Sequence, residues 1–472
     1  MLKKTKIICT MGPACENEEV LKQLILNGMN VARFNFSHGD HQEQKGRFDR
    51  LVKVRNELGM PIAALMDTKG PEIRLGIFEN GKEVLEDGAK FILTTEEILG
   101  TSEKATITYK ELKDDVKVGS TILINDGLIE LVVDEITATD IICTVVHGGT
   151  VSNKKGINVP GVELSMPYLS ETDTADILFA IETGFDFIAA SFVRNAEDVK
   201  AIRSLLESKG SHMKIIAKIE NRQGVENLDE ILEVANGIMV ARGDMGVEIP
   251  FEEVPHIQKD MIKKANKAKK HVITATQMLE SMINNPRPTR AEVTDVANAV
   301  YEGTTAIMLS GETAAGKYPV EAVATMSRIA IEAEKNMDYA SFLAARELDT
   351  TDDLSSAIAY ASCTTAIEIN AAAIISVTIS GSTCKKVAGL KPPVPILGGS
   401  MHDDVCRKMS LMWGVQSMHV DKKETEEELF EEAVRVSKQA GYIKSGDRVV
   451  IVAGVPLGKV GSTNMIRVLD VK

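Results

Sequence analysis

The chain has 472 residues, of which 44% are hydrophobic and 26% are charged, and it carries a formal net charge of -14 at pH 7. A chain of this length exceeds what one hydrophobic core supports, so we expect roughly two to four domains. The negative charge excludes a polyanionic partner such as nucleic acid or an acidic membrane, but it allows small anions to bind in local basic pockets.

The N-terminal segment "MLKKTKIICTMG" predicts a β-strand rather than a signal peptide. Its lysines are followed by only three apolar residues before Thr10, which is too short for a secretory apolar region. No apolar run approaches the ~18–20 residues of a membrane span. The six cysteines are dispersed and form no C-x-x-C pair or zinc-like Cys/His cluster. These features predict reduced thiols and a cytoplasmic protein without a membrane partner.

One pattern recurs along the chain: a short run rich in Val, Ile, Ala and Met ends in polar residues or glycine, and a segment with helical spacing follows. The runs are "TKIICTMG" (5–12), "NVARFNFSHG" (30–39), "IAALMDTKG" (62–70), "DFIAASFV" (186–193), "KIIAKIEN" (214–221), "GIMVARGD" (237–244), "HVITATQM" (271–278) and "AIMLSGET" (306–313).

Helix-like segments separate the runs. "NEEVLKQLILNG" (17–28), "AEDVKAIRSLLESKG" (196–210) and "LDEILEVANG" (228–237) repeat apolar residues at helical spacing and end at glycine. Strands that alternate with helices predict parallel β-α units, and near-continuous apolar strands predict a sheet covered by helices. Eight units favour a (β/α)8 TIM barrel, with a doubly wound open sheet as the alternative.

The stretch 70–168 has a different character. "TITYKEL" (106–112), "VGSTILINDG" (118–127), "LIELVVDEI" (128–136) and "IICTVVHGG" (141–149) alternate apolar and polar residues and contain Asp-Gly and Gly-Gly turns. We interpret this stretch as a small β-barrel domain inserted after the third strand. It would stand over the C-terminal face of the barrel as a lid.

A third unit follows the loose segment "SFLAARELDTTDD" (341–353). "AAAIISVTISGSTCKKVAGL" (371–390) predicts strand, glycine loop and helix, and "DRVVIVAGVPLGKVGSTN" (447–464) predicts a strand and a long loop. The predicted domains are therefore 1–69 and 169–342 for the barrel, 70–168 for the lid, and 343–472 for an open α/β domain serving regulation and oligomerisation.

The strand ends carry cations, carboxylates and hydroxyls, and on a barrel these side chains converge on one mouth. They are Arg33, Asn35, Ser37 and His38 after the second run; Asp67, Thr68, Lys69, Glu72 and Arg74 after the third; Lys218 and Glu220 in the fifth; Arg242 and Asp244 in the sixth; Thr276 and Gln277 in the seventh; and Ser310 and Glu312 in the eighth.

Lys218 and Glu220 are two residues apart on one strand, so both point to the same side. Glu220 and Asp244 on neighbouring strands suit Mg2+, which retains positions for substrate oxygens. Arg33 and Arg74 can grip phosphate or carboxylate, and Lys218 can stabilise charge on a transferring phosphoryl group or an enolate.

Simpler interpretations stand beside this one. Lys218 and Glu220 can form a structural salt bridge, Arg33 can pair with Asp67, and His38 can be a loop hydrogen-bonder. "GETAAGKY" (311–318) resembles a phosphate-binding P-loop, but Tyr318 replaces the required Ser or Thr. The combination of polar strand ends favours an active site, and we set the P-loop aside.

A second phosphate cradle is predicted in the C-terminal unit. In "SGSTCKK" (380–386), Ser380, Ser382 and Thr383 offer hydroxyls, Gly381 allows close backbone approach, and a helix begins there. The glycine-rich loop 454–461 would close over the same place. A phosphate site away from the barrel suggests an effector.

The chain resembles the pyruvate kinase family from end to end. The resemblance is carried by "TKIICTMGPA", "VARFNFSHG", "LMDTKGPEIR", "IIAKIENRQGVEN", "GIMVARGDMGVEIP", "TATQMLESMINNPRPTRAE" and "MLSGETAAGKYP". It implies transfer of the phosphoryl group of phosphoenolpyruvate to ADP, giving pyruvate and ATP, with Mg2+ or Mn2+ and K+ as cofactors.

The resemblance also implies a role for each matching residue. These are Lys218, Arg33 and Thr276 as catalytic residues; Glu220 and Asp244 as divalent-metal ligands; Asn35, Ser37, Asp67 and Thr68 as the K+ site; Arg33, Thr276 and the backbone amides around Ala241, Arg242, Gly243 and Asp244 as substrate contacts; Asn35, His38 and Arg74 as nucleotide contacts; and Glu72 as the residue that marks K+ dependence.

The effector loop departs from the pattern of family members that bind fructose 1,6-bisphosphate. Where some of those members carry a basic residue, this chain has Ile379, Ser382 or Val455, and Lys459 is one candidate cation for a second phosphate. The resemblance implies a sugar monophosphate or nucleotide monophosphate as readily as the bisphosphate, and a homotetramer. Two other functions stay open from the residues alone: a metal-dependent enolate lyase or aldolase on a TIM barrel, and a non-enzymatic phosphometabolite sensor.

Overall fold

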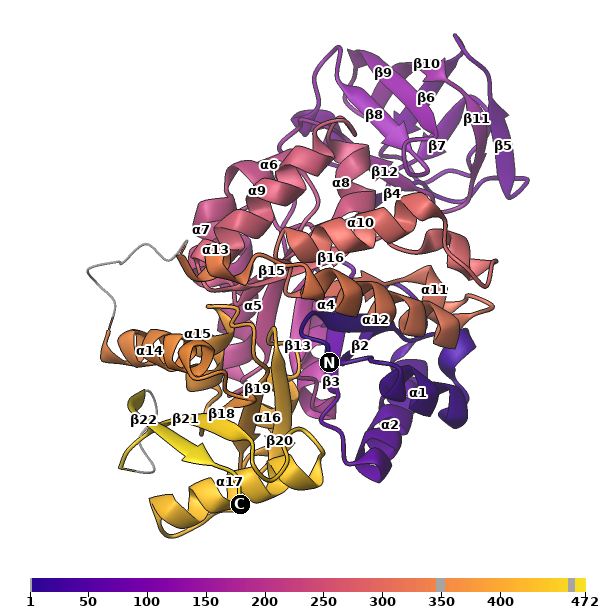
Figure 1. Ribbon diagram of the computed structural model, residues 1–472. Helices are drawn as coiled ribbons and strands as arrows, with labels where there is room; N and C mark the ends of the chain where they lie inside the picture. The colour runs from indigo at the N-terminus through magenta and orange to yellow at the C-terminus, as the bar shows by residue number, and fades with distance from the viewer. Residues whose placement is uncertain (1, 345–352, 457–462) are drawn as a thin grey trace.

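The computed structural model describes residues 2–344, 353–456 and 463–472. The chain forms three bodies of structure, of which one is inserted between the third and fourth strands of the barrel (Figure 1). A helix-covered barrel lies in the middle, the inserted β-structure stands at one end of it, and the C-terminal α/β structure lies at the opposite end.

The eight predicted strands form one closed parallel barrel, which confirms the TIM barrel over the open sheet. Their order around the barrel is β1-β17-β16-β15-β14-β13-β3-β2. The strands are β1 (Lys6–Thr10), β2 (Val31–Asn35), β3 (Ala63–Asp67), β13 (Phe187–Ala190), β14 (Lys214–Ile219), β15 (Gly237–Ala241), β16 (His271–Ala275) and β17 (Ala306–Leu309).

Helices connect and cover these strands. They are η1 (Pro13–Cys15), α1 (Glu18–Leu26), α2 (His41–Leu58), α4 (Glu171–Thr183), α5 (Ala196–Ser208), α6 (Arg222–Glu226), α7 (Leu228–Val234), α8 (Arg242–Glu248), α9 (Val254–Lys267), η2 (Glu280–Ile283), α10 (Arg290–Tyr301), α11 (Gly311–Ala314), α12 (Pro319–Lys335) and α13 (Tyr339–Ala344). Side-chain caps fix several of their starts: the Asp40 carboxylate accepts a hydrogen bond at α2, and Thr289 and Glu292 form a capping box at α10.

The inserted β-structure contains two sheets. Its elements are β4 (Ile73–Arg74), β5 (Lys82–Leu85), β6 (Lys90–Thr94), β7 (Lys104–Thr106), α3 (Leu112–Asp115), β8 (Thr121–Ile124), β9 (Ile129–Ile136), β10 (Asp140–His147), β11 (Gly149–Ser152) and β12 (Gly156–Asn158). Seven strands run in the order β4-β12-β8-β9-β10-β6-β7, and β11 pairs with β5.

The larger inserted sheet curls until its two edges meet. An antiparallel bridge joins Leu75, after β4, to Ile107, after β7. The Gly76 amide also donates to the Thr106 carbonyl at 2.8 Å. One expected strand here is wrong: in "TITYKEL", only Thr106 belongs to a strand, and Leu112 begins α3. The alternation of apolar residues reflects burial of Ile107, Tyr109 and Leu112 in the core of the small barrel.

The C-terminal structure is an open five-stranded sheet in the order β20-β19-β18-β21-β22, with β22 antiparallel. Its elements are α14 (Leu354–Glu368), β18 (Ala373–Val377), α15 (Ser382–Ala388), β19 (Ile396–Ser400), α16 (Asp403–Met409), β20 (Val415–His419), α17 (Glu426–Gln439), β21 (Arg448–Gly454) and β22 (Thr463–Asp470). Within the described residues, no helix has the length and apolar character needed to cross a membrane.

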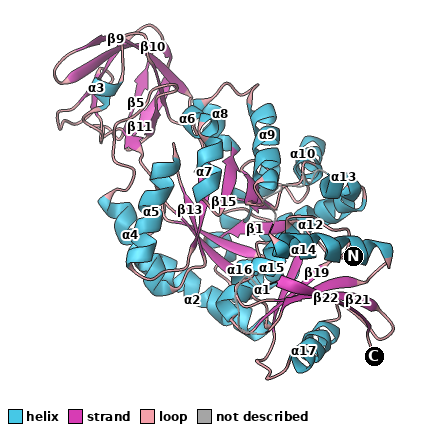
Figure 2. Ribbon diagram, turned by 90° about the vertical axis from the view of Figure 1, so that its left-hand side faces the viewer, coloured by secondary structure: helices cyan, strands magenta, loops and turns pink. Residues whose placement is uncertain are grey.

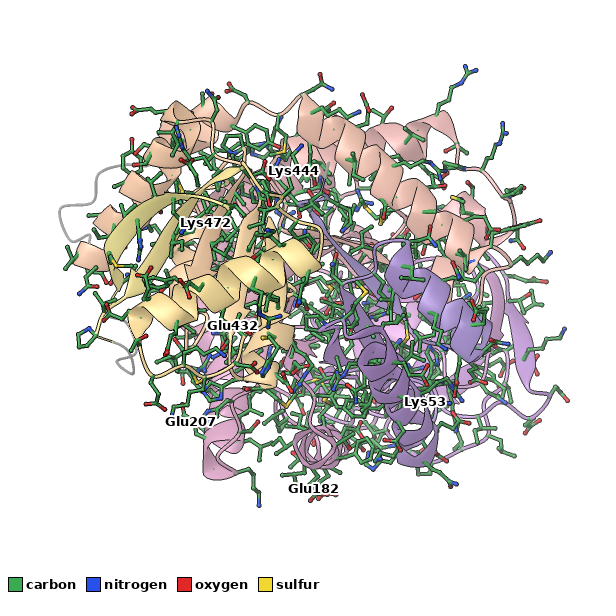
Figure 3. The ribbon with its side chains drawn as sticks, turned by 60° about the horizontal axis from the view of Figure 1, so that its bottom comes forward. Lys53, Glu182, Glu207, Glu432, Lys444 and Lys472 are labelled. Carbon is green, nitrogen blue, oxygen red and sulfur yellow. The ribbon has the colours of Figure 1, made fainter. Side chains whose placement is uncertain are left out.

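The C-terminal structure closes the N-terminal end of the barrel. Leu411, between α16 and β20, is fully buried in the cluster that fills the barrel interior, together with Ile8, Val31 and Phe187. Beside it, the Gly414 amide donates to the Lys4 carbonyl at 2.9 Å. Figure 3 looks at this end, where α17 with Glu432 and the C-terminal sheet lie in front of the barrel.

Candidate active site

A cleft of about 620 Å³ lies between the inserted β-structure and the C-terminal ends of the barrel strands. One wall comes from the inserted part, including Arg74 and Asn158, and the other from the barrel, including His38, Phe192 and Asp244. Figure 2 shows the inserted part standing off the barrel near α6 and α8. Several predicted site residues therefore line one space.

Next to the cleft, Lys218 lies at the centre of a buried network. Its Nζ is 2.9 Å from Glu220 Oε1 and 3.2 Å from Asp67 Oδ1. Asp67 also accepts a 2.5 Å hydrogen bond from Arg33 Nε. Side chains from three strand ends therefore meet, as the strand-end pattern predicts, and the simpler salt-bridge interpretations describe real contacts as well.

The network holds its charges in a low-dielectric setting. Burial by itself would lower the pKa of Lys218, but the carboxylates of Asp67 and Glu220 raise it above its usual value. Burial would raise the pKa of Asp67, yet Arg33 and Lys218 together lower it. Burial raises the pKa of Glu220 to about 8, and Lys218 offsets only part of that. A further cation beside Glu220 would therefore stabilise its charged form, which burial disfavours.

Two strands supply network members that the sequence interpretation missed. Ser191, directly after β13, accepts a hydrogen bond from Lys218 Nζ at 2.8 Å, and its Oγ lies 3.2 Å from Asp67 Oδ1. Thr10, the last residue of β1, accepts a 2.9 Å hydrogen bond from Arg33. These are the first and fourth barrel strands, the two from which no strand-end residue was chosen. The polar ends of "KIICT" and "FIAAS" are the signal that could have found them.

The carboxylates fit a divalent cation. Glu220 Oε2 accepts the Phe192 amide at 2.5 Å, whereas Oε1 is buried and has no hydrogen-bond partner in suitable geometry among the described residues. Asp244 lies in the first turn of α8, which follows the neighbouring strand β15, and lines the cleft. No three His, Cys, Asp or Glu side chains of the described chain gather as a ligand group. Two carboxylates match Mg2+, which takes few protein ligands.

The four residues predicted for K+ lie on adjacent strands. Asn35 pairs with Asp67 in register between β2 and β3. The Asn35 side-chain oxygen accepts the Ser37 amide at 3.0 Å, and the Thr68 carbonyl accepts the Ser191 hydroxyl at 2.7 Å. Oxygen atoms that could coordinate a cation therefore lie close together here, although the Asp67 carboxylate also contacts Arg33 and Lys218.

The end of β16 meets the start of α8. The Gly243 amide donates to Thr276 Oγ1 at 2.8 Å, and Thr276 Oγ1 donates to the Ala275 carbonyl at 2.6 Å. Thr276 has a φ of 70°, which is strained for a β-branched residue. The Arg242 guanidinium turns away to Asp295 at 2.7 Å and to the Thr276 carbonyl at 2.6 Å. Arg242 thus fixes the α8–β16 corner through its side chain.

At the lid, Arg74 and Glu72 contact each other. Arg74 Nε donates to Glu72 Oε2 at 2.8 Å, and a second guanidinium nitrogen donates to the Lys154 carbonyl. His38, Glu72 and Arg74 all line the cleft. Asn158 Nδ2 donates to Glu248 Oε1 at 2.7 Å, which ties the end of β12 to α8.

The predicted effector loop is away from this cleft, before α15. Ser380 is exposed, Gly381 has a φ of 82°, and Ser382 begins the helix. The Thr383 hydroxyl is buried and hydrogen-bonds the Thr463 hydroxyl at 2.7 Å, so it does not face solvent. Most of the loop 454–461, with Lys459, lies outside the described residues. "GETAAGKY" forms the short helix α11 and the segment after it.

Comparison with known proteins adds sequence evidence. A family model described as "Pyruvate kinase, barrel domain" matches residues 2–323, and one described as "Pyruvate kinase, alpha/beta domain" matches residues 356–469. A curated pyruvate kinase of Geobacillus stearothermophilus is 51% identical over 471 residues, covering 99% of this chain and 80% of the relative. One from Clostridium acetobutylicum is 50% identical over 469 residues, covering 99% of both chains. One from Sporosarcina psychrophila is 49% identical over 473 residues, covering 99% and 80%.

Proposed function

This chain belongs to the pyruvate kinase family, and we propose on that premise which residues carry each part of its reaction. The protein is a phosphotransferase that moves the phosphoryl group of phosphoenolpyruvate to ADP, giving pyruvate and ATP in glycolysis. The lyase or aldolase alternative is not supported by these comparisons. The observation that carries the residue assignments is the buried network around Lys218 beside the cleft.

Pyruvate kinases need a divalent and a monovalent cation, and we assign the divalent one, Mg2+ or Mn2+, to Glu220 and Asp244. Glu220 Oε1 supports this assignment, because it is buried and contacts Lys218 Nζ without a well-aligned hydrogen bond among the described residues. When bound, the cation would neutralise charge on the phosphoryl oxygens. Lys218 is placed to stabilise charge that grows on the phosphoryl group and the enolate oxygen during transfer. Arg33 would grip the phosphate.

The α8–β16 corner suits the other end of phosphoenolpyruvate. We assign the substrate carboxylate to the backbone amides around Ala241, Arg242, Gly243 and Asp244 at the start of α8, of which the Gly243 amide donates here to Thr276 Oγ1. We assign Thr276 to the face at which the enolate would be protonated. Its hydroxyl is held by the Gly243 amide, which fixes its orientation.

For the nucleotide we propose Asn35, His38 and Arg74, of which His38 and Arg74 line the cleft from opposite walls. The inserted part would exclude water during transfer and so prevent hydrolysis. We keep 1–69, 70–168, 169–342 and 343–472 as the proposed domain limits. The Asn158–Glu248 contact supports a lid function for 70–168.

K+ is the proposed monovalent cation, held by Asn35, Ser37, Asp67 and Thr68, with Glu72 as the marker of dependence. Adjacent strands β2 and β3 bring these oxygen donors together, which supports the assignment. We also propose a cytoplasmic homotetramer regulated by a phosphorylated metabolite at Ser380, Gly381, Ser382 and Thr383. The two accessible serines support binding of a single phosphate.

The test is pyruvate formation from phosphoenolpyruvate and ADP with Mg2+, measured with K+ and again with only a large organic cation. Strong activity that collapses without K+ is the expected result. Activity indifferent to K+ would refute the monovalent site and leave the phosphotransferase in place. No pyruvate in either condition, even with sugar phosphates added, would contradict the proposed chemistry of the cleft.

A further inference from the structure

A second charged pocket lies at the opposite end of the barrel from the cleft, where the C-terminal structure meets the barrel. Its volume is about 30 Å³. His271 and Thr305 line it from the barrel, at and just before the starts of β16 and β17, and Lys385 and Trp413 line it from the C-terminal structure. We call it the lysine pocket, and its proposed binding residues are Lys270, His271, Lys385 and Lys391; Lys269 also lines it.

The lysine pocket gathers cations without a counter-charge. Among the described residues that line it, none is Asp or Glu. Lys391 is only 3% exposed, its Nζ donates to the Gly303 carbonyl, and it lies 5.3 Å from the Trp413 ring centroid. Lys270 donates to the Ala235 carbonyl at 2.7 Å. The backbone carbonyls and the Trp413 ring provide hydrogen-bond and cation–π partners for these ammonium groups, but they carry no net negative charge to neutralise them.

Two groups in the pocket have no partner in the described part of the chain. Lys385 Nζ has neither a hydrogen bond nor a salt bridge there, and the ring nitrogens of His271 have no hydrogen bond. Burial, together with Lys385 and Lys270, lowers the pKa of His271 to about 3. Burial lowers the pKa of Lys391 to about 7. Burial is the main cause of both lowered pKa values, and no carboxylate of the described residues offsets it in either case.

We propose that the lysine pocket binds a phosphate group, either inorganic phosphate or the phosphate of a small phosphomonoester. Lys270, Lys385 and Lys391 would surround the anion, and His271 would complete the site once protonated. Lysine binds phosphate as a point charge, so three lysines that line one pocket suit a tetrahedral dianion. The small volume excludes a whole nucleotide inside the pocket.

The place of the pocket implies a structural consequence. Its walls come from both the barrel and α15, so a bound phosphate would hold the two parts together. The same helix begins with Ser382 of the proposed effector loop and carries Lys385 one turn later. The pocket is separate from the proposed active site.

The test is calorimetric titration of the full-length protein with inorganic phosphate, in a phosphate-free buffer of constant ionic strength. Saturating phosphoenolpyruvate and Mg2+, without ADP, keep phosphate from the active site. Lys385→Gln should weaken phosphate binding at this site about tenfold or more, since a hydrogen bond to a charged group is lost. Lys386→Gln is the matched control, because Lys386 is the next residue of α15 but pairs with Asp353 at 2.6 Å. Equal binding by both variants would overturn the proposal.

A second measurement separates binding from packing. Without phosphate, Lys385→Gln should raise the melting temperature, because it removes repulsion from neighbouring cations. With phosphate, the variant should lose the stabilisation that the wild type and Lys386→Gln gain. A melting temperature lowered equally in both buffers would show that Lys385 only packs. Glucose 6-phosphate in a parallel titration distinguishes the source: a response there assigns a phosphomonoester, and a response to inorganic phosphate alone assigns the free anion.

Discussion

Lys218 lies between two buried carboxylates, and this placement makes its charge permanent and its position fixed. Its Nζ contacts Glu220, Asp67 and Ser191 within 3.2 Å. Such a group needs no rearrangement when negative charge develops nearby. The same contacts mean that removal of the ammonium leaves two buried carboxylates without their shared cation.

Lys218→Met should therefore lower kcat by about 100- to 1,000-fold, the usual effect of losing one preorganised donor. The affinity for phosphoenolpyruvate should change only a few-fold, since the ammonium acts mainly on charge formed in the transition state. Steady-state kinetics and calorimetry check the two quantities. Lys45→Met, at an exposed residue paired with Asp49, should leave both unchanged. Near-normal kcat in Lys218→Met would remove the central assignment.

Ser191 positions Lys218 and Asp67 rather than acting on substrate. Ser191→Ala should lower kcat about tenfold, because the hydroxyl hydrogen bond to the ammonium is lost. The KM for phosphoenolpyruvate should stay nearly constant. A lower melting temperature with normal kcat at 25 °C would show that the hydroxyl serves folding alone.

At the scale of elements, α8 connects the proposed metal site to the lid. It carries Asp244 in its first turn and Glu248 at its end, where Asn158 of β12 donates at 2.7 Å. A hydrogen bond to a partly buried carboxylate can hold the lid over the cleft.

Asn158→Ala should raise the KM for ADP about fivefold with little change in the KM for phosphoenolpyruvate, because an untethered lid holds the nucleotide less often. Initial-rate measurements with each substrate varied give both constants. The control variant is Asn80→Ala, because Asn80 is an exposed lid residue. Asn153 is unsuitable as a control because its side chain accepts a hydrogen bond from the Phe78 amide within the lid. Equal changes in both KM values would contradict a role for this contact in nucleotide binding.

His271, the first residue of β16, links stability to pH. Burial and the neighbouring lysines lower its folded pKa to about 3, below the unfolded value of about 6.5. The folded state therefore binds fewer protons between these values, and stability present above pH 6.5 is lost as the pH falls toward 3. His271→Gln should flatten the fall in melting temperature between pH 6.5 and 4.5 in phosphate-free buffer. Exposed His212→Gln is the control, and parallel curves for wild type and His271→Gln would contradict this expectation.

Much of the element order could be predicted because burial leaves a periodic pattern. All eight barrel strands are fully or mostly buried, so their apolar runs stand out, and their polar ends indicated Lys218, Glu220 and Arg33. The strand predicted for "TITYKEL" was wrong. Its alternating apolar residues are buried through an isolated bridge at Ile107 and the start of α3 at Leu112, not along one strand. Ser191 was missed because no residue was chosen from the end of its strand, and a lone polar residue after an apolar run is a weak signal.

At the scale of the whole molecule, contacts between distant segments are the part that sequence patterns do not reveal. The sequence around Leu411 has no pattern that indicates contact with the barrel, yet Leu411 is fully buried among residues of the barrel interior. Arg407 of α16 pairs with buried Asp186, just before β13, at 2.9 Å. The lysine pocket likewise joins residues from both parts of the chain. Periodicity reports which face of an element is buried, but not which distant segment covers it.

Leu411→Ala should lower the free energy of unfolding by about 2–5 kcal/mol, the range for deleting a buried leucine. Scanning calorimetry should show the whole barrel losing stability, although the substitution lies in the C-terminal structure. Leu354→Ala, at a residue 66% exposed, should change stability by less than about 0.5 kcal/mol. A barrel transition unmoved by Leu411→Ala would contradict the burial seen for this side chain.

Leu411 also bears on how the protein is made. Synthesis proceeds from the N-terminus, so all eight barrel strands leave the ribosome before the residue that closes their N-terminal end. A nascent barrel would wait with part of its interior apolar surface uncovered while the rest of the C-terminal structure is translated, at about 5–20 residues per second. During that interval the unfinished chain would be a natural client for chaperones. Truncated chains that end before Leu411 would keep this exposure permanently.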